Sequence, residues 1–449
     1  MSARALNDLI SLFFPFLVYI FAKKLFKKNV IALIASLLTA SSLGLHIIAR
    51  QAHEGYLASF LIIASSIFYI KFIEKFDINN AIYFLLSLTL SLFTYQSSRI
   101  FVVFFIIYST IYLFFVSKSK RKSLSLFTLI VLFLLIIFSV KDLNSSSTRI
   151  KSLFIFSNPG LHVKTNELRI EGASIFLYNK LTVGLRELLF NHLEYFSPQF
   201  LAKSGDENTR FGFGEMSPIT PIEYIFIFIG IYYLFKNNEK WKNFILFLFV
   251  FSPLSASLTW TGLSLTRSLF MLIPAMLISS YGFYYYIKKV NLNKKIVTTF
   301  IIIIEILFLF YSWNFYINHY PKRTSVMYSM QCGYKELAQY VKNNYDKFDK
   351  FYISPELGQP YIFLLFYNKY SPSDYQKQAI LGNPDKYGFG QVDKFDKFIF
   401  SIADAKEKNN ISIIAFPHDF ENISLSETSK LKKIKVRDFE VFWILEKLN

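Results

Sequence analysis

Long apolar stretches separated by short polar connections make up most of the first 316 residues. Nearly all are long enough to cross the roughly 30 Å hydrocarbon core of a bilayer as a helix. About ten segments are predicted, near residues 5–22, 29–48, 55–73, 80–96, 100–116, 123–140, 221–235, 243–260, 267–287 and 296–316. This pattern predicts a polytopic α-helical membrane protein.

The pattern changes after residue 316, where Lys, Asp and Asn become frequent and apolar runs shorten to strand length. Helical spacing is found at 333–344, and short strands are predicted at 350–353, 397–401, 411–416, 433–436 and 439–445. We therefore expect two domains. Residues 1–316 form the membrane domain, with a long outer loop at 141–220, and residues 317–449 form a small soluble α/β domain.

Composition and charge narrow the choice of function. The 449 residues are 53% hydrophobic and 18% charged, unlike a soluble enzyme. The net charge of +18 would suggest nucleic acid in a soluble protein, but here the lysines lie between apolar runs and serve as membrane anchors. No nucleic-acid partner is expected. Because Cys332 is the single cysteine, neither an internal disulfide nor a metal site is predicted.

The distribution of basic residues predicts the orientation. One set of alternate connections carries two to four lysines or arginines each, and the opposite set carries single arginines, Arg50, Arg99 and Arg267. Cytoplasmic loops collect basic residues. We therefore expect a multi-pass protein of the plasma membrane, with both termini, the outer loop and the C-terminal domain outside.

Ionisable residues at the predicted outer boundary are candidates for a site, because charge near hydrocarbon is costly. The first group is His46, Arg50, His53 and Glu54. If the helix continues past Arg50, His46 and Arg50 share one face with His53 or Glu54.

Three further groups lie on the same side. Tyr95 and Arg99 form an i, i+4 pair at an outer turn, and Arg267 opens the ninth segment. The outer loop adds four charged candidates, Asp206, Glu207, Arg210 and Glu215.

Arginine at three outer helix ends has two interpretations. The guanidinium can bind phosphate oxygens in a bidentate manner, so Arg50, Arg99 and Arg267 could hold a lipid phosphate. Each could instead anchor its own helix by reaching the headgroups. The three together, with the cluster of histidines and Glu54 around Arg50, favour an anionic substrate site. The loop stretch 174–196 is amphipathic and predicts either a helix on the membrane surface or an ordinary packing helix.

Several stretches, in this order, resemble the polyprenyl-phosphate-dependent glycosyltransferases of the C type. That group includes protein O-mannosyltransferases and lipid A aminoarabinose transferases. The similar stretches are Ser2–Asn7, His46–Glu54, Thr94–Arg99, Tyr195–Pro198 with Gly205, Asp206 and Gly214, Pro253–Thr259 and Arg267–Pro274. The resemblance covers most of the membrane part.

The resemblance implies a reaction on the outer face, in which a polyprenyl-phosphate sugar passes to an acceptor. The acceptor, whether protein, lipid or glycan, is not identified, nor is a divalent-cation requirement, and no cofactor is expected. By position, Arg50, Arg99 and Arg267 would stabilise the departing phosphate, with His46 and Tyr95 orienting it.

The family's acidic general base belongs to an outer loop that we expect upstream of Met1, together with one helix. The catalytic residue is therefore unknown, and Asp8 matches no such motif. The alternative is a non-enzymatic membrane protein that binds or transports lipid-linked glycan. Transporters usually carry charged or broken helices at the membrane midplane, whereas these segments are apolar there apart from sites such as Glu305.

Overall fold

The computed structural model describes residues 2–116, 153–172, 174–212, 214–260, 262–356, 358–385, 390–405, 410–422 and 429–447. The chain divides into two compact units, Met1–Asn318 and His319–Asn449. The unit boundary lies two residues beyond the expected domain boundary. The sixth predicted segment, 123–140, lies outside the described residues.

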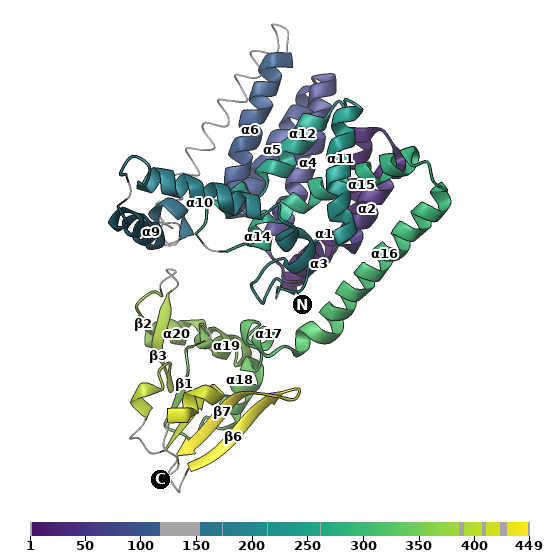
Figure 1. Cartoon of the computed structure of the whole chain (residues 1–449). Helices are drawn as coiled ribbons and strands as arrows, with labels where there is room; N and C mark the ends of the chain where they lie inside the picture. Colours follow the sequence, from purple (N-terminus) through teal and green to yellow (C-terminus); the bar gives the residue numbers. More distant parts are fainter. Residues whose placement is uncertain are drawn as a thin grey trace. The chain divides into compact units, whose positions relative to one another are not determined.

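The first unit is built from helices (Figure 1). Its longer helices are α1 (Ser2–Phe26), α2 (Asn29–Ser41), α3 (Leu43–Arg50), α4 (Glu54–Lys75), α5 (Ile78–Thr94), α6 (Gln96–Val116), α9 (Pro159–Ile170), α10 (Lys180–Glu194), α11 (Pro221–Lys236), α12 (Lys242–Phe251), α15 (Leu272–Lys289) and α16 (Lys294–Asn314). Short turns of helix are η1 (Ile155–Ser157), η2 (Gln199–Ser204), α13 (Leu254–Ser257), α14 (Leu265–Ser268), η3 (Leu269–Met271) and η4 (Phe315–His319).

Five helical stretches of the described chain are long and apolar enough to cross a membrane. They are Arg4–Phe26, Glu54–Lys75, Gln96–Phe115, Leu265–Lys289 and Lys294–Lys322. The bent pair α2 and α3 makes a sixth if it counts as one span, and α5 and Lys242–Ser257 are shorter apolar helices. The structure thus supports five or six candidate spans among the described residues, fewer than the ten predicted.

The predicted helix at 29–48 is broken. α2 ends at Ser41, and the Ser42 hydroxyl caps α3 by accepting the Leu45 N–H at 3.3 Å. The two helices meet at 51°. α3 then ends at Arg50, and Ala52 adopts a φ of 54° before α4 begins. The helix does not continue past Arg50, so the expected face shared with His53 or Glu54 is wrong.

Two other expectations fail at chain breaks. Tyr95 lies between α5 and α6 in an extended conformation, φ −144° and ψ 136°, so it forms no helical i, i+4 pair with Arg99. The predicted segment 243–260 is interrupted after Phe251, and α13 restarts beyond Pro253. Proline lacks the N–H that a continuing helix needs, which accounts for the second break.

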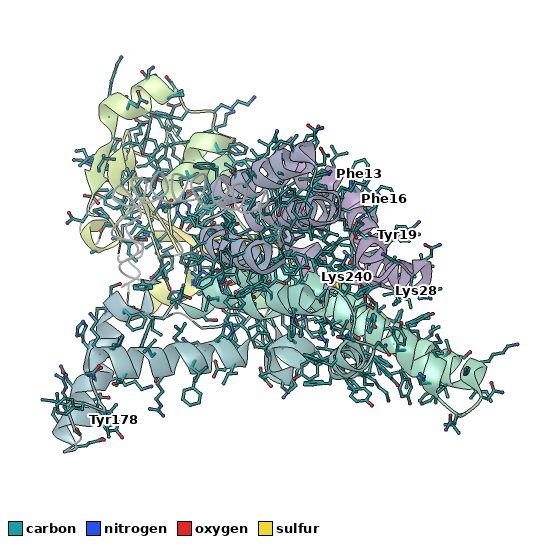
Figure 2. The ribbon with its side chains drawn as sticks, turned by 90° about the horizontal axis from the view of Figure 1, so that it is seen from above. Phe13, Phe16, Tyr19, Lys28, Tyr178 and Lys240 are labelled. Atoms are coloured by element: carbon teal, nitrogen blue, oxygen red, sulfur yellow. The ribbon has the colours of Figure 1, made fainter. Side chains whose placement is uncertain are left out.

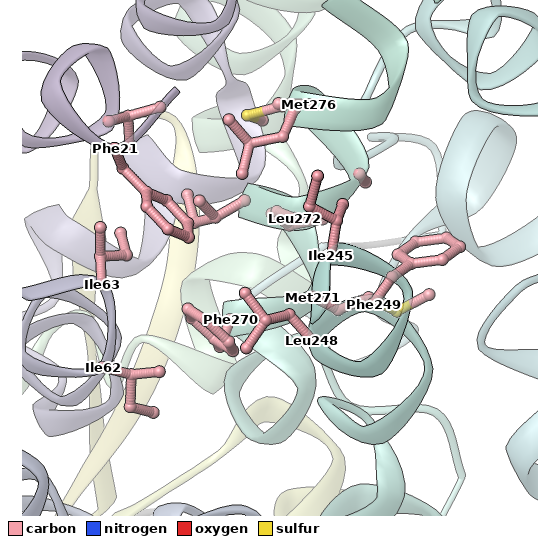
Figure 3. Close-up of a cluster of buried hydrophobic side chains, with 14 of the residues drawn as sticks. Phe21, Ile62, Ile63, Ile245, Leu248, Phe249, Phe270, Met271, Leu272 and Met276 are labelled. Carbon is pink, nitrogen blue, oxygen red and sulfur yellow. The ribbon is translucent and has the colours of Figure 1, made fainter. Parts of the chain in front are cut away.

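Side chains from several helices interlock in the core of the first unit (Figure 3). Phe21 of α1, Ile63 of α4, Leu248 of α12, Phe270 of η3 and Met276 of α15 are all buried there. The core thus joins helices that lie far apart in the sequence.

Two glycines bring α11 and α15 into close contact. A Cβ on Gly282 would lie 2.6 Å from the nitrogen of Gly230, where no atom fits. Small residues are typical of closely packed membrane helices, because there the attraction between helices comes largely from close contact.

The outer surface of several helices in this unit is apolar. Large side chains such as Leu12, Phe16 and Phe310 are mostly exposed. Figure 2 shows Phe13, Phe16 and Tyr19 along the rim formed by α1. Exposed apolar surface of this extent is unusual for a soluble protein and is consistent with contact with lipid.

The second unit contains a mixed seven-stranded sheet of order β2-β3-β4-β1-β5-β7-β6. Its strands are β1 (Lys350–Ile353), β2 (Ile380–Gly382), β3 (Gln391–Phe395), β4 (Phe398–Ile399), β5 (Ile411–Ala415), β6 (Ser429–Val436) and β7 (Phe439–Lys447). β1 pairs in parallel with β4 and β5, and the other pairs are antiparallel. Its helices are α17 (Thr324–Ser329), α18 (Tyr334–Asn343), α19 (Pro360–Tyr367) and α20 (Pro372–Gln378), with short turns η5 (Tyr320–Lys322), η6 (Ala403–Ala405) and η7 (Pro417–Asn422).

A buried carboxylate ties the sheet of this unit to α18. Glu446 of β7 accepts hydrogen bonds from Lys432 at 2.6 Å, Tyr340 at 2.8 Å and Lys347 at 2.9 Å. Burial raises the pKa of Glu446, but the three hydrogen bonds outweigh burial and hold the pKa at about 2. The ionised form therefore stabilises the fold at neutral pH.

Candidate functional site

A small, open pocket of about 20 Å³ lies in the first unit where α4 and α6 begin. Its polar lining includes Tyr95 and Arg267, and the rest is mostly small hydroxyl and apolar side chains. The other lining residues are Gly55, Ala58, Ser59, Ile62, Ser97, Ser98, Phe101, Ser252, Ser255, Thr266, Leu269 and Phe270. None of the described residues that line this pocket is acidic.

The start of two long helices gives the pocket a positive character. Gly55 lies in the first turn of α4, and Ser97 and Ser98 lie in the first turn of α6. The first turn of a helix leaves N–H groups without partners in the helix, and the helix dipole puts partial positive charge there. The Gly55 N–H is bound by His53 and the Ser98 N–H by the Tyr95 carbonyl, so it is the helix dipoles and Arg267, rather than these two N–H groups, that favour an anion in this space.

Arg267 is half-buried and held from the side. One of its terminal nitrogens, Nη1, donates a hydrogen bond of 2.9 Å to the Thr259 hydroxyl. Its neighbour Thr266 lies against α4, since a Cβ on Gly55 would come within 3.2 Å of the Thr266 carbonyl oxygen. The absence of a side chain at Gly55 thus lets the segment that carries Arg267 approach the start of α4.

Asp206 fixes the backbone that leads to Arg267. Its carboxylate accepts the N–H of Leu265 at 2.7 Å and that of Asn208 at 2.8 Å, and the residue is 2% exposed. Burial raises the pKa of Asp206 to about 6, against the lowering effect of the two N–H groups and of the nearby Arg267. The Tyr195 hydroxyl accepts the Ser264 N–H at 2.9 Å and fixes the preceding residue.

His53 closes the turn between α3 and α4. Its Nδ1 accepts the Gly55 N–H at 3.0 Å, and its ring packs on Tyr95 with centroids 5.0 Å apart. Burial lowers the pKa of His53, although Glu54 at 4.0 Å acts in the opposite direction. Because Nδ1 accepts a hydrogen bond, the neutral ring carries its proton on Nε2. Asn7 of α1 donates to the His53 carbonyl at 3.1 Å.

Arg50 and His46 belong to a second cluster, with the end of α16. Arg50 donates to the Tyr316 hydroxyl at 3.2 Å and lies 5.8 Å from the centre of that ring. The His46 ring meets Trp313 edge-on, with centroids 4.6 Å apart. Asp8 of α1 is near enough to act on His46 electrostatically. This cluster brings an acid, a base and a guanidinium together at the ends of three helices.

The expected site residues therefore fall into different places. Tyr95 and Arg267 line one pocket, and Arg99 follows Ser98 in the same turn of α6 without belonging to the described lining. Of the loop candidates, Asp206 has a positioning role, while Glu207, Arg210 and Glu215 are exposed. The Gln51 side chain donates to the carbonyl of Arg210, which fastens this loop to the turn after α3.

Some residues of the site were not predicted. Ser97, Ser98 and Thr266 carry no charge, so a search for ionisable groups passes over them. The signal that could have identified them is their position directly after a helix start or beside an arginine. Tyr195 and Asn7 each lie in a stretch that resembles the glycosyltransferase family, but the single hydrogen bond through which each acts was not predicted.

The described residues include one group with the geometry of metal ligands, and it lies in the second unit. The ligand atoms of Glu356, His418 and Asp419 all lie within 4.8 Å of one another. The sequence predicted no metal site, because Glu356 is far from the other two along the chain. Parallel pairing of β1 with β5 brings their following loops together. His418 and Glu356 are exposed and 2.5 Å apart, so a hydrogen bond between them accounts for the group.

Comparison with known proteins adds no assignment. No known family model matches the chain, and no curated protein matches it significantly. The resemblance to C-type glycosyltransferases rests on the short stretches named above, and the function has to be argued from the pocket.

Proposed function

We propose that the chain is a membrane glycosyltransferase, or the larger part of one, that uses a polyprenyl-phosphate sugar. The observation that carries this proposal is the Arg267 pocket, the pocket at the starts of α4 and α6 described above. It combines two helix N-termini, one guanidinium and seven hydroxyl groups, with no carboxylate in its described lining. Such a site suits a phosphate group. The neighbouring long apolar helices suit the lipid that carries it.

The proposed chemistry is transfer of the sugar at its anomeric carbon. The bond between that carbon and the phosphate oxygen breaks, and the electron pair leaves with the phosphate. Arg267 and the two helix starts stabilise this negative charge as it develops. The acceptor hydroxyl forms the new bond and loses its proton to a general base that we do not assign. Arg50 and Arg99 are proposed as further phosphate contacts from neighbouring helix ends.

The finer membrane arrangement is also part of this proposal. The shorter apolar helices α5, α11 and Lys242–Ser257 would cross the membrane with the longer ones, as would the segment at 123–140, giving about ten spans. The basic connections would face the cytoplasm. The second unit, including its sheet, would then lie outside the cell with the Arg267 pocket at the outer face.

The test is binding of a short-chain polyprenyl phosphate to the purified full chain in detergent. Arg267→Ala removes a charge-assisted contact worth about 1.5–3 kcal/mol, so affinity should fall about 10- to 150-fold. Arg267→Lys keeps the charge but loses the bidentate guanidinium, so its affinity should lie between those of the wild type and Arg267→Ala. Arg437→Ala removes an exposed arginine in the β6–β7 turn and should bind as the wild type does. Equal affinity of Arg267→Ala and Arg437→Ala would refute the phosphate role of Arg267.

A second assay separates transfer from transport. The enzyme should release free polyprenyl phosphate from a labelled donor in the presence of an acceptor. Movement of the intact labelled donor across proteoliposomes, with no transfer, would favour the alternative function of a lipid-linked glycan transporter.

A further inference from the structure

Helices α9 and α10 form an arm that projects from the helices of the first unit. In Figure 1 α10 runs crosswise to α5 and α6, and Figure 2 shows Tyr178 at the far tip of the same arm. α10 starts at a capping box between Asn179 and Thr182. At its other end, His192 lies 3.0 Å from the Ser257 hydroxyl of α13. The α9–α10 arm, residues 159–172 and 174–194, is also held at the start of α9, where the space beside Gly160 is filled by the Trp260 ring.

One face of α10 is apolar and exposed. The side chains concerned recur every four residues, so most of them follow one side of the helix. They are Leu181, Leu185, Leu189, Phe190 and Leu193, each between 50% and 61% exposed. The opposite face is packed, since Val183 is buried and Phe156 of η1 fills the space beside Gly184. The exposed leucines are therefore not part of the core of the unit.

The tip of the arm is more apolar still. Ile175, Phe176 and Leu177 follow one another in the turn before α10, and they are 66%, 87% and 67% exposed. Large exposed apolar patches mark contact with a membrane or another protein. The patch on α10 and this tip lie in one continuous piece of chain.

The surroundings favour a bilayer as the partner. The same unit contains five or six candidate membrane spans, and α13 packs against both α10 and α6. The arm therefore leaves the unit at the end where α6 begins, crosswise to that helix. The ends of membrane-spanning helices lie at the lipid interface, so a helix that runs across those ends is in the position expected of an interfacial helix.

The charges of the arm indicate how it would bind. Four basic residues, Lys164, Arg169, Lys180 and Arg186, are balanced by four acidic ones, Glu167, Glu171, Glu187 and Glu194. Attraction to anionic headgroups is therefore weak, and the apolar side chains must provide the affinity. Arg186 lies 5.4 Å from the ring centre of Phe190, an arrangement in which the charged end can reach the headgroups above an inserted ring.

We propose that the α9–α10 arm is a membrane-docking element that lies in the plane of the lipid interface. The apolar face of α10 and the tip at Phe176 insert about 5–10 Å, to the boundary of headgroups and acyl chains. The choice of the outer leaflet rests on the orientation proposed above. The arm then holds α13, and through it the segment that leads to Arg267, at a fixed depth in the membrane.

The single cysteine of the chain makes a depth measurement direct. In a Cys332→Ser background, single cysteines at Phe176, Leu189 and Glu167 are labelled with an environment-sensitive fluorophore in lipid nanodiscs. Glu167 is the control, because it is an exposed polar position of α9. Nitroxides on the acyl chains should quench the labels at Phe176 and Leu189 strongly and the label at Glu167 weakly. Iodide in the water should give the reverse order.

The alternatives give different results. Labels at Leu189 and Glu167 that respond alike to both quenchers would overturn the proposal. Protection of Phe176 and Leu189 from both quenchers would mean that protein covers the face, either a second copy or the C-terminal unit, and would also overturn it. Leu185→Cys repeats the test if Leu189→Cys does not fold. Polyprenyl phosphate binding is measured separately, so failure of either proposal leaves the other standing.

The balanced charge gives one more expectation. Quenching by acyl-chain nitroxides should persist in nanodiscs of neutral lipid and at high salt. Loss of quenching when anionic lipid is omitted would show that headgroup charge, rather than the apolar face, carries the contact.

Discussion

The carboxyl group of Asp206 provides a sharp test of the loop that positions Arg267. Asp206→Asn keeps the shape of the side chain and one acceptor, but its NH₂ group faces one of the two backbone N–H donors of Leu265 and Asn208. Leaving a buried donor without a partner costs about 1–3 kcal/mol. Glu207→Gln is the matched control, since it removes one acidic charge from the next, exposed residue.

The effect of pH on this variant has a definite sign. The pKa of Asp206 is raised from its ordinary value of 3.8 to about 6, mainly by burial. The neutral acid therefore stabilises the fold below pH 3.8, and this contribution is lost as the pH rises from 3.8 to 6. Each pH unit in this interval is worth about 1.4 kcal/mol, so the whole change is about 3 kcal/mol. Asparagine does not titrate, so the stability of the Asp206→Asn variant does not fall in this way as the pH rises.

The assay is thermal unfolding of the purified full chain in detergent from pH 4 to pH 7.5, followed by tryptophan fluorescence. At pH 4 the Asp206→Asn variant should unfold at a lower temperature than the wild type. The difference should narrow by about pH 7, because the wild type then loses its pH-dependent advantage, and the unpaired N–H of the variant leaves a remaining difference. A difference that stays constant or widens with rising pH would refute the reasoning, and Glu207→Gln should show neither effect.

Three further predictions concern other parts of the chain. Gly282→Val should lower the unfolding temperature by forcing α15 away from Phe226 of α11, at a cost of about 1–3 kcal/mol or more; an unchanged midpoint would contradict this packing. Glu446→Gln should destabilise β7 at pH 7 by about 3 kcal/mol, measured as faster amide hydrogen exchange in that strand. The difference from the wild type should vanish as the pH falls from 4.5 to 2. Asp438→Asn, an exposed control, should not change exchange. Gly55→Val should weaken polyprenyl phosphate binding by displacing the segment before Arg267, and unaltered affinity would count against the described pocket.

The apolar runs in the sequence correctly predicted the positions of many helices. A run of about twenty apolar residues that is buried or faces lipid must satisfy its backbone hydrogen bonds internally, and a helix does so. The apolar runs did not predict where helices break. The Ser42 hydroxyl donates to the carbonyl of Pro218 at 3.1 Å while it caps α3, and a contact with a residue so distant leaves no mark on local periodicity. Strands β2 and β3 were missed for a related reason, since both are short and are supported by pairing with each other rather than by a pattern in the sequence, and β2 is mostly exposed.

The sequence indicated single residues of the candidate site but not which of them lie together in the structure. A basic residue on the side of the membrane that is otherwise poor in charge indicated Arg267, and a polar interruption indicated Tyr95. Their meeting depends on Asp206, which ties a loop to Leu265 across more than fifty residues. Arg50 contacts Tyr316 beyond the end of α16, a partner that the sequence did not indicate. Proximity of this kind is set by tertiary packing, which spacing along the chain does not encode.

Photo-crosslinking shows directly whether lipid phosphate occupies the Arg267 pocket. A polyprenyl phosphate with a photoreactive group next to the phosphate is bound to the full chain, irradiated and mapped by peptide mass spectrometry. We expect modification in the first turns of α4 and α6 and around Thr266, and we expect unlabelled polyprenyl phosphate to compete with it. Modification confined to the apolar groove beside α16, around Glu305, with these positions unmodified, would contradict this expectation.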